Sequence, residues 1–216
     1  MPCFNEEEHI CNLIKDIKKI VKDVMVVDDG STDDTSQRAL DGGAIVIKHV
    51  SNQGKGAALR TGFSYIERKR FSALITMDAD RQHDYTELPK FIEEFKKNSA
   101  DIVVGNRMSD TRNMPFVRLC TNRITSFFTS LFLSCRISDT QSGYRLIRTE
   151  VLKNINLLTS NFETESEVLI KAGRKGFRIK EIPIKTVYLP NARSKIRPLK
   201  DTLKFIRLIL SSIFFR

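Results

Sequence analysis

The chain has 216 residues, of which 41% are hydrophobic and 29% charged, and its formal net charge is +10. This length and apolar content exclude an intrinsically disordered chain, and the 4 Cys and 3 His have no spacing typical of a disulfide scaffold or a zinc site. The excess charge is local, because residues 171–216 contain 13 Lys and Arg against 2 acidic residues, whereas residues 1–170 are nearly neutral. Such a basic segment suits an anionic partner, for example a phospholipid surface or a phosphorylated substrate.

The first 105 residues alternate predicted helices with short apolar strands. Helices are predicted at 10–21, 54–65 and 88–95, and strands at 24–27, 44–47, 73–77 and 102–104. Continuous apolar strands that alternate with helices are typical of a parallel sheet covered on both faces. Ligands of such sheets bind at the carboxyl ends of the strands.

The second half has a different pattern. Residues 114–137 have apolar residues at helical spacing, but Arg118 and Arg123 interrupt them, so this segment is not a membrane span. A polar turn at 139–145 enters a predicted strand, a helix is predicted at 162–175, and another strand at 178–182. Residues 199–216 form a predicted basic amphipathic helix of the kind that lies at a membrane interface, or alternatively packs on the core or on a second subunit.

Asp78 and Asp80 stand directly after the predicted strand at 73–77. In an extended chain their side chains leave the same side of the backbone, with Cα atoms about 6–7 Å apart. Carboxylate oxygens are the hard ligands that Mg²⁺ and Mn²⁺ prefer, and such ions keep open positions for phosphate oxygens. Because Gln82 follows at the same period, Asp78, Asp80 and Gln82 form a candidate metal site.

A second acidic pair, Asp28 and Asp29, follows the predicted strand at 24–27. A carboxylate in this position can accept hydrogen bonds from a base or a ribose. We expect Ser31 or Thr32 to cap the next helix.

Residues 52–56, Asn-Gln-Gly-Lys-Gly, are superficially similar to a phosphate-binding loop. The Walker spacing fails, because His49 stands where its first Gly belongs and Gly56 where Ser or Thr belongs. We expect Lys55 instead to open a helix that lies near the nucleotide.

Together these segments resemble the family-two glycosyltransferases of the GT-A fold, and most closely the dolichyl-phosphate mannosyltransferase-like branch. The matching stretches follow the family order over nearly the whole chain. They are Pro2-Cys3-Phe4-Asn5-Glu6-Glu7, Val26-Val27-Asp28-Asp29-Gly30-Ser31, Asn52-Gln53-Gly54-Lys55-Gly56, Met77-Asp78-Ala79-Asp80-Arg81-Gln82-His83, Gly105-Asn106-Arg107, Asp139-Thr140-Gln141-Ser142-Gly143-Tyr144-Arg145, Phe162-Glu163-Thr164-Glu165 and Ser194-Lys195.

The resemblance implies a role for each matching residue. The implied nucleotide-sugar-binding residues are Pro2, Phe4, Glu6, Val27, Asp28, Asp29, Asp78, Ala79, Asp80 and Lys195. The implied ligands of a diphosphate-bridging Mg²⁺ or Mn²⁺ are Asp78, Asp80 and Gln82, and the implied contacts of the acceptor phosphate are Arg107, Arg118 and Arg123. The candidate catalytic residues are Asp80, Arg107 and Asp139, of which Asp139 either orients acceptor or sugar hydroxyls or only forms a turn.

The resemblance also implies an α/β GT-A fold, with a mixed, mostly parallel sheet flanked by helices. It divides the chain into a glycosyltransferase domain at 1–198, with a nucleotide-sugar half at 1–105 and an acceptor half at 106–198, and the basic helix at 199–216. The family has an apolar strand directly before its Pro-x-x-Asn-Glu segment, whereas this sequence starts at Met1. We therefore expect a fragment, a misplaced start, or a sheet that lacks this strand and exposes an edge.

The implied reaction is transfer of a sugar from a nucleoside-diphosphate sugar to a polyprenyl phosphate, with inversion at the anomeric carbon. A phosphomonoester is largely anionic at neutral pH and attacks without a general base. We expect the helices near 116–135 and 203–215 to lie on the anionic cytoplasmic face of a membrane, so that the protein is cytoplasmic and peripherally attached.

Two alternatives stay open at this point. The first is a family-two enzyme with a soluble or glycan hydroxyl as acceptor, which needs a carboxylate base such as Asp139 or Glu163. The second is a non-catalytic basic protein that binds membranes. A nucleic acid is not an expected partner, because the basic segment lacks interleaved aromatic residues. The donor is open between GDP-mannose, UDP-glucose and UDP-N-acetylglucosamine, and the oligomeric state is undetermined.

Overall fold

The computed structural model describes residues 1–112, 114–133, 135–185, 187 and 204–210. The strands are β1 (Pro2–Cys3), β2 (Met25–Asp28), β3 (Ile45–Lys48), β4 (Ala73–Thr76), β5 (Ile102–Asn106), β6 (Arg145–Arg148) and β7 (Ile179–Pro183). The helices are α1 (Ile10–Lys18), α2 (Thr35–Asp41), α3 (Lys55–Glu67), α4 (Leu88–Lys97), α5 (Phe116–Ser130), α6 (Thr149–Asn154) and α7 (Glu163–Arg174), with a 3₁₀ turn η1 (Tyr85–Glu87).

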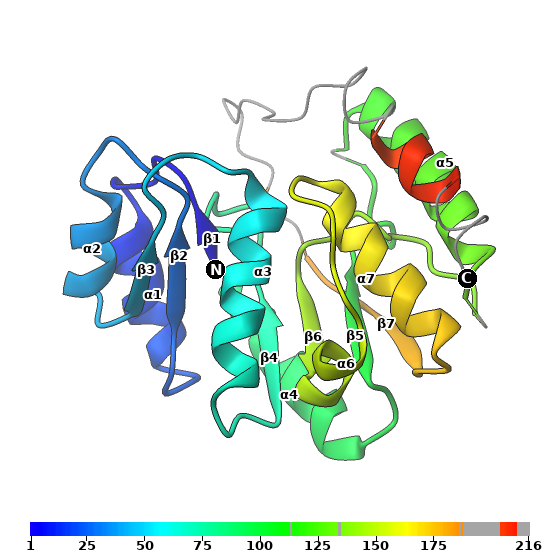
Figure 1. The fold of residues 1–216 in the computed structure, drawn as a ribbon, viewed down its shortest axis with the longest axis horizontal. Coiled ribbons are helices and arrows are strands. Elements are labelled where there is room, and N and C mark those ends of the chain that lie inside the picture. Colours follow the sequence, from blue (N-terminus) through cyan, green and yellow to red (C-terminus); the bar gives the residue numbers. More distant parts are fainter. Residues whose placement is uncertain (113, 134, 186, 188–203, 211–216) are drawn as a thin grey trace.

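The strands form two sheets, as Figure 1 shows. The first sheet has the order β1-β2-β3 and is parallel, and the second has the order β4-β6-β5-β7. In the second sheet β6 is antiparallel to both β4 and β5, whereas β7 is parallel to β5. The expected α/β fold with mixed strand directions is therefore confirmed, but the strands are divided between two sheets.

The helices bury the apolar faces that the sequence pattern predicts. In α1 the residues at helical spacing, Ile10, Leu13, Ile14 and Ile17, are all buried. Phe91 is fully buried in α4, and α3 buries Leu59 and Phe63. Every predicted strand is present within a residue or two of its predicted bounds, and the structure adds α6, which the sequence pattern did not indicate. Ser31 and Thr32 do not cap α2, because this helix begins only at Thr35.

The first strand is short. β1 pairs in parallel with only the last two residues of β2, Val27 and Asp28. The Met1 amino group is buried and donates a hydrogen bond to the Met25 carbonyl oxygen at 2.7 Å. Burial lowers the pKa of this amino group, because the charged form loses its water. β1 is therefore a two-residue strand at the edge of the first sheet, and the described strands divide into two sheets.

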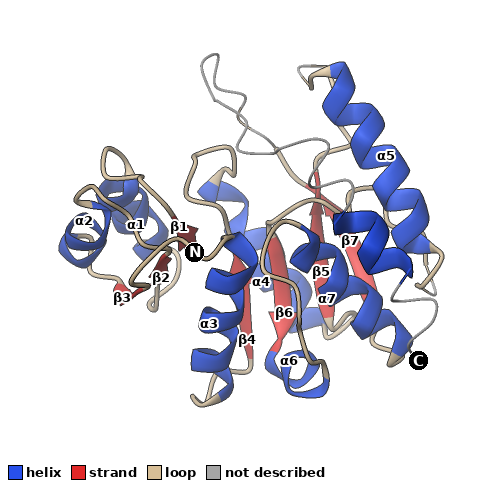
Figure 2. Cartoon of the chain, turned by 45° about the horizontal axis from the view of Figure 1, so that its top comes forward, coloured by secondary structure: helices blue, strands red, loops and turns tan. Residues whose placement is uncertain are grey.

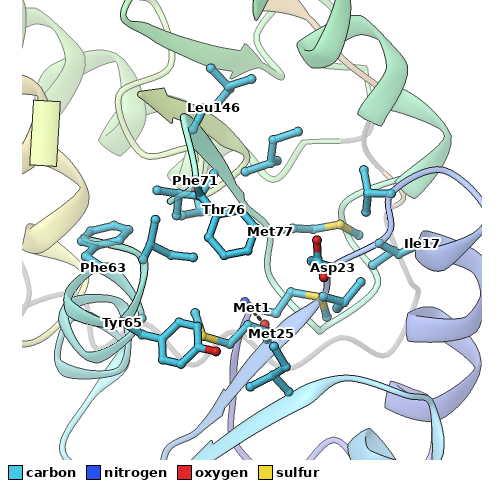
Figure 3. A pocket seen from close by; sticks show the side chains of 18 of the residues that line it. Met1, Ile17, Asp23, Met25, Phe63, Tyr65, Phe71, Thr76, Met77 and Leu146 are labelled. Atoms are coloured by element: carbon cyan, nitrogen blue, oxygen red, sulfur yellow. Dashed lines mark hydrogen bonds between the residues drawn. The ribbon is translucent and has the colours of Figure 1, made fainter. Parts of the chain in front are cut away.

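A cavity of about 410 Å³ lies between β2 and β4, next to β1 (Figure 3). Side chains of α1, α3 and α4 line it together with the two strands, and most of them are apolar, among them Met25, Phe63 and Met77. Gly62 of α3 also faces this space, where a Cβ atom would lie 3.2 Å from the Met25 Cε atom. The cavity thus marks the boundary between the two sheets.

The long helix α5 buries polar side chains and exposes apolar ones, which is the reverse of an ordinary surface helix. Its buried side chains are polar, namely Asn122, Thr125, Ser126 and Thr129. Its large apolar side chains are exposed, namely Phe116, Val117, Ile124, Phe127 and Phe128, and Leu131 directly after the helix is exposed too. Exposed apolar residues in such number mark an interaction surface.

The C-terminal helix of the sequence analysis is described only at 204–210, and the rest of 199–216 lies outside the described residues. Residues 204–210 are helical, with Phe205 and Leu208 buried and Ile206 and Leu210 exposed. In the described part of the chain no helix is both long enough and apolar enough to cross a bilayer.

Two glycines of α3 give opposite predictions for stability. Gly62→Ala should stabilise the protein by about 1 kcal/mol, because alanine favours a helix interior and its Cβ atom would lie 3.2 Å from the flexible end of Met25 and at an ordinary contact distance of 3.6 Å from Val27 Cγ2. Gly56→Ala should destabilise it by about 1–3 kcal/mol, because the new Cβ atom would lie 2.0 Å from the Thr164 Oγ1 atom and 2.6 Å from the Ser160 carbonyl carbon. Urea unfolding of both variants checks this, and a stabilising Gly56→Ala would contradict it.

Candidate active site

The loop after β4 carries Asp78 and Asp80 at the carboxyl end of the strand, as the sequence predicts. The loop is held internally: the Asp78 N–H donates to His83 Nδ1 at 3.0 Å, and the Gln82 N–H donates to Asp80 Oδ1 at 3.1 Å. The His83 ring stacks on Tyr144, with ring centroids 5.0 Å apart. Burial lowers the pKa of His83 to about 4, so its ring is neutral and accepts the Asp78 hydrogen bond.

Lys55, the first residue of α3, reaches this loop from the nucleotide-half side. Its Nζ atom lies 2.7 Å from Asp78 Oδ1 and 2.9 Å from Glu165 Oε1 of α7. The three side chains are mostly buried, with 18%, 23% and 7% of Lys55, Asp78 and Glu165 exposed. The ammonium group of Lys55 therefore joins the loop after β4 to the first turn of α7. This loop, residues 77–83, carries the candidate metal ligands and is called the metal loop below. From the sequence Lys55 is expected to open a helix near the nucleotide, whereas the sequence indicates no role in the site for Glu165.

The two aspartates of the loop differ in their electrostatic surroundings. Burial raises the pKa of Asp78, but the ammonium of Lys55 outweighs this effect and holds the pKa well below its usual value. Burial and the negative charge of Asp78 raise the pKa of Asp80. Among the described residues no lysine, arginine or histidine forms an ion pair with Asp80. Asp80 is thus the carboxylate of the two that has no ion-pair partner among the described residues.

These oxygens fit a hard divalent cation only in part. Asp80 provides a half-buried carboxylate, and Gln82 lies on the same loop with its Oε1 atom 3.1 Å from Arg118 Nη1. The described residues contain no group of three His, Cys, Asp or Glu side chains arranged to hold a metal. A cation at Asp80 would therefore take further ligands from a bound anion such as a diphosphate.

A buried ion pair lies at the end of β5. Arg107 donates from Nε and Nη2 to the Asp139 carboxylate at 2.7 and 2.8 Å, and its backbone N–H donates to the same group at 3.0 Å. Asn122 of α5 adds a fourth donor at 2.7 Å. Asp139 is fully buried and Arg107 is 5% exposed. Asp139 therefore holds Arg107 and ties it to α5.

Arg145 is a buried cation that the sequence analysis did not assign. Its guanidinium donates to the backbone carbonyl oxygens of Thr140, Ser142 and Glu165. The donors thus join the polar turn at 139–145 to the start of α7. Gly143 in this turn lies so close to the loop carboxylates that a Cβ atom would be 2.7 Å from Glu165 Oε1 and 2.9 Å from Asp78 Oδ2.

The acidic pair after β2 has partners within the protein. Asp28 accepts the Ser31 N–H at 2.8 Å and contacts the Ser36 hydroxyl. Asp29 accepts the backbone N–H groups of residues 53 and 54 at 3.0 and 2.8 Å and bonds the His49 ring at 2.7 Å. Both carboxylates are buried. In this structure they hold the loops around the strand ends, which are the walls of the candidate nucleotide site.

The remaining predicted residues are placed as follows. Pro2 is in β1, Phe4 and Glu6 follow it, and the Glu6 N–H donates to Thr35 Oγ1 at 2.8 Å. Val27 in β2 and Ala79 beside Asp78 are buried. Arg118 and Arg123 are on α5, where Arg123 is exposed. Lys195 lies outside the described residues. The structure therefore brings the strand-end motifs to one edge of the two sheets, with α5 beside the metal loop.

Comparison with known proteins identifies this arrangement. The model of "Glycosyl transferase family 2" matches residues 1–155. An uncharacterized protein of Methanocaldococcus jannaschii is 36% identical over 99% of this chain and 91% of its own length. A UDP-N-acetylglucosamine–dolichyl-phosphate N-acetylglucosaminyltransferase of Methanococcus voltae is 32% identical over 87% of this chain and 84% of its length. A polyprenol monophosphomannose synthase of Mycolicibacterium smegmatis is 30% identical over 85% and 74%.

Solved structures agree on the fold. Glucosyl-3-phosphoglycerate synthase from Mycobacterium tuberculosis, in complex with Mn²⁺, UDP and phosphoglyceric acid, has a TM-score of 0.74 and 20% sequence identity. The match covers 98% of this chain and 75% of that one. At this identity the similarity concerns the fold, and it supports the expected GT-A architecture.

The buried pair of Arg107 and Asp139 gives a second prediction for stability. Asp139→Ala should cost about 3–5 kcal/mol in the free energy of unfolding, because it leaves the Arg107 charge buried without its partner. Arg107→Met should cost a similar amount, and the double variant Arg107→Met/Asp139→Leu should cost much less than the sum of the two. Chemical denaturation of the three variants measures this coupling. Strictly additive costs would show that the two charges do not stabilise each other.

Proposed function

The chain belongs to glycosyl transferase family 2, and we propose that it transfers a hexose-type sugar from a nucleoside-diphosphate sugar to a polyprenyl or dolichyl phosphate. The observation that carries the proposal is Asp80, a half-buried carboxylate at a strand end without a cation among the described residues. Relatives whose names specify dolichyl-phosphate and polyprenol acceptors, at 32% and 30% identity, support the lipid part.

We assign the metal site to Asp80, with Asp78 and Gln82 beside it. A divalent cation bound there would neutralise negative charge on the departing diphosphate. The Mycobacterium tuberculosis enzyme of similar fold was solved in complex with Mn²⁺ and UDP, which supports a divalent cation at this site. Asp80 would hold the cation directly, because Asp78 is already paired with Lys55 and the Gln82 amide oxygen already accepts from Arg118.

The donor would lie across the strand ends of the first sheet. We propose that Pro2, Phe4, Glu6 and Val27 surround the base and ribose, with Ala79 beside the ribose. Asp28 and Asp29 would act mainly by fixing the loops around this pocket, since their carboxylates already accept hydrogen bonds from the protein. Lys195 would close over the diphosphate.

Arg107 is the cation closest to the reaction centre in this proposal. Its Nε and Nη2 atoms bind Asp139, so the guanidinium has a fixed orientation, and its Nη1 atom would donate to a phosphate. A polyprenyl phosphate is largely dianionic at neutral pH, and its oxygen attacks the anomeric carbon opposite the diphosphate. This single displacement inverts the anomeric configuration. It requires no general base, which fits the complete engagement of Asp139 with protein donors.

The exposed apolar side chains of α5 support a lipid acceptor. They lie on the helix that also carries Arg118, whose Nη1 atom contacts the metal loop through Gln82 at 3.1 Å, and the exposed Arg123. Apolar side chains with neighbouring arginines suit the interface of an anionic bilayer, where a polyprenyl chain stays in the lipid while its phosphate reaches the loop. We therefore propose peripheral attachment to a membrane through α5 and the helix that includes residues 204–210.

A panel of nucleotide sugars tests the donor and the metal together. With Mn²⁺, one of GDP-mannose, UDP-glucose and UDP-N-acetylglucosamine should raise the melting temperature by roughly 5–10 °C at about 100 times Kd. Asp80→Ala should abolish this shift, because it removes the carboxylate assigned to the cation. Asp41→Ala, an acidic residue at the exposed end of α2, is the control and should keep it. No shift with any donor would refute the proposed function.

Liposome co-sedimentation tests the attachment. Phe127→Glu/Leu131→Glu should weaken binding to vesicles containing anionic lipid by about tenfold or more, because two exposed apolar side chains become charged. The control is Leu40→Glu in α2, an exposed apolar residue at the opposite end of the molecule (Figure 2). Equal binding of both variants and the unchanged protein would exclude α5 as the attachment surface.

A further inference from the structure

Lys55 occupies a position between two carboxylates that come from different parts of the chain. Its ammonium group touches Asp78 at 2.7 Å and Glu165 at 2.9 Å, and its side chain lies over the Phe162 ring at 5.8 Å. The lysine is 18% exposed, so its charge is largely removed from water. A charge in such surroundings requires close partners of opposite sign, and both are present.

The backbone around Lys55 fixes this position. Gly54 has a φ of 99°, and a Cβ atom there would lie 2.5 Å from the Ser160 carbonyl oxygen. At Gly56 the Ser160 carbonyl carbon would be only 2.6 Å from a Cβ atom. The two glycines thus let the start of α3 press against the segment before α7, and Lys55 between them is directed toward Glu165. The other partner is also held, because Arg145 binds the Glu165 carbonyl oxygen.

The contact with Lys55 gives the two aspartates of the metal loop different surroundings. Asp78 has a permanent cation within hydrogen-bond distance, whereas among the described residues Asp80 accepts only the Gln82 N–H. If Lys55 were neutral, Asp78 and Glu165 would lose the cation that both of them contact, while Asp78 would still lie near the negative charge of Asp80. The loss of this ammonium charge would make the surroundings of Asp78 more negative and would favour binding of a metal ion even when no diphosphate is present.

We propose that Lys55 is the internal counter-ion of the metal loop: a positioning residue that neutralises Asp78 and Glu165, reserves Asp80 for the metal, and makes metal binding depend on the donor diphosphate. The inference rests on the proposed function for the identity of the metal and the donor. The donor diphosphate would supply the oxygen ligands that Asp78 and Glu165 do not offer to the metal while they are paired with Lys55.

The test measures Mn²⁺ binding without nucleotide, by the loss of the free-ion electron paramagnetic resonance signal. Lys55→Met should bind Mn²⁺ alone roughly tenfold or more tightly than the unchanged protein, because the ion replaces the missing ammonium. Lys55→Met/Glu165→Gln should lose part of this gain, and Lys55→Arg should stay close to the unchanged protein. The control Lys97→Met removes one positive charge from an exposed pair on α4 and should leave Mn²⁺ binding unchanged.

The outcomes separate this inference from the proposed function. Mn²⁺ binding by Lys55→Met that is no tighter than in the unchanged protein overturns the counter-ion role, even where a donor binds normally. Absence of donor binding by the unchanged protein refutes the proposed function, whatever the lysine variants do. If circular dichroism shows that Lys55→Met is unfolded, Lys55→Gln, which keeps a hydrogen-bond donor without the charge, decides by the same comparison.

Discussion

Pairing of buried charge is the constraint on which this site depends. Lys55 between Asp78 and Glu165, and Arg107 against Asp139, place two cations and three carboxylates largely out of water. Neither cation would be tolerated there alone, because the cost of removing an ion from water exceeds what packing returns. Each pair also joins segments that are distant in sequence. The charges therefore hold the loop after β4, the end of β5, α5 and α7 in one fixed arrangement.

This arrangement suits chemistry between two phosphorylated molecules. A nucleoside-diphosphate donor and a lipid-phosphate acceptor both bring negative charge to the strand ends, and the proposed reaction must keep those charges close together. In the proposed site Arg107 would supply a cation whose direction is fixed by Asp139, and Asp80 would supply the position for a second one. Such preorganised groups stabilise charge without rearranging during the reaction. Membership of glycosyl transferase family 2 accords with this division of labour.

Much of the fold could be predicted from the sequence, because apolar periodicity reports directly on burial. Ile10 and Ile14 identified α1, and the apolar run before Asp78 identified β4. The division into two sheets could not be predicted, since apolar periodicity reports which residues are buried but not which strands pair with one another. Asp78 and Asp80 were found from their spacing, but Lys55 was missed because its partner Glu165 is 110 positions away. The sequence did contain one indication, because Lys55 stands between two glycines. Glycines allow the backbone to bend, but a bend does not need a lysine, so the charge suggested a further role.

Helix α5 attaches to the body of the protein through directional bonds. Asn122 binds Asp139, and Ser126 contacts both Asn122 and Thr140, so the inward face of the helix is a row of polar contacts at 2.7–3.0 Å. Apolar surfaces can shift relative to one another at little cost in free energy. Directional hydrogen bonds, in contrast, restrict rotation of the helix and its displacement by one turn. The position of α5 and the orientation of the Arg107 guanidinium are therefore set by the same carboxylate, that of Asp139.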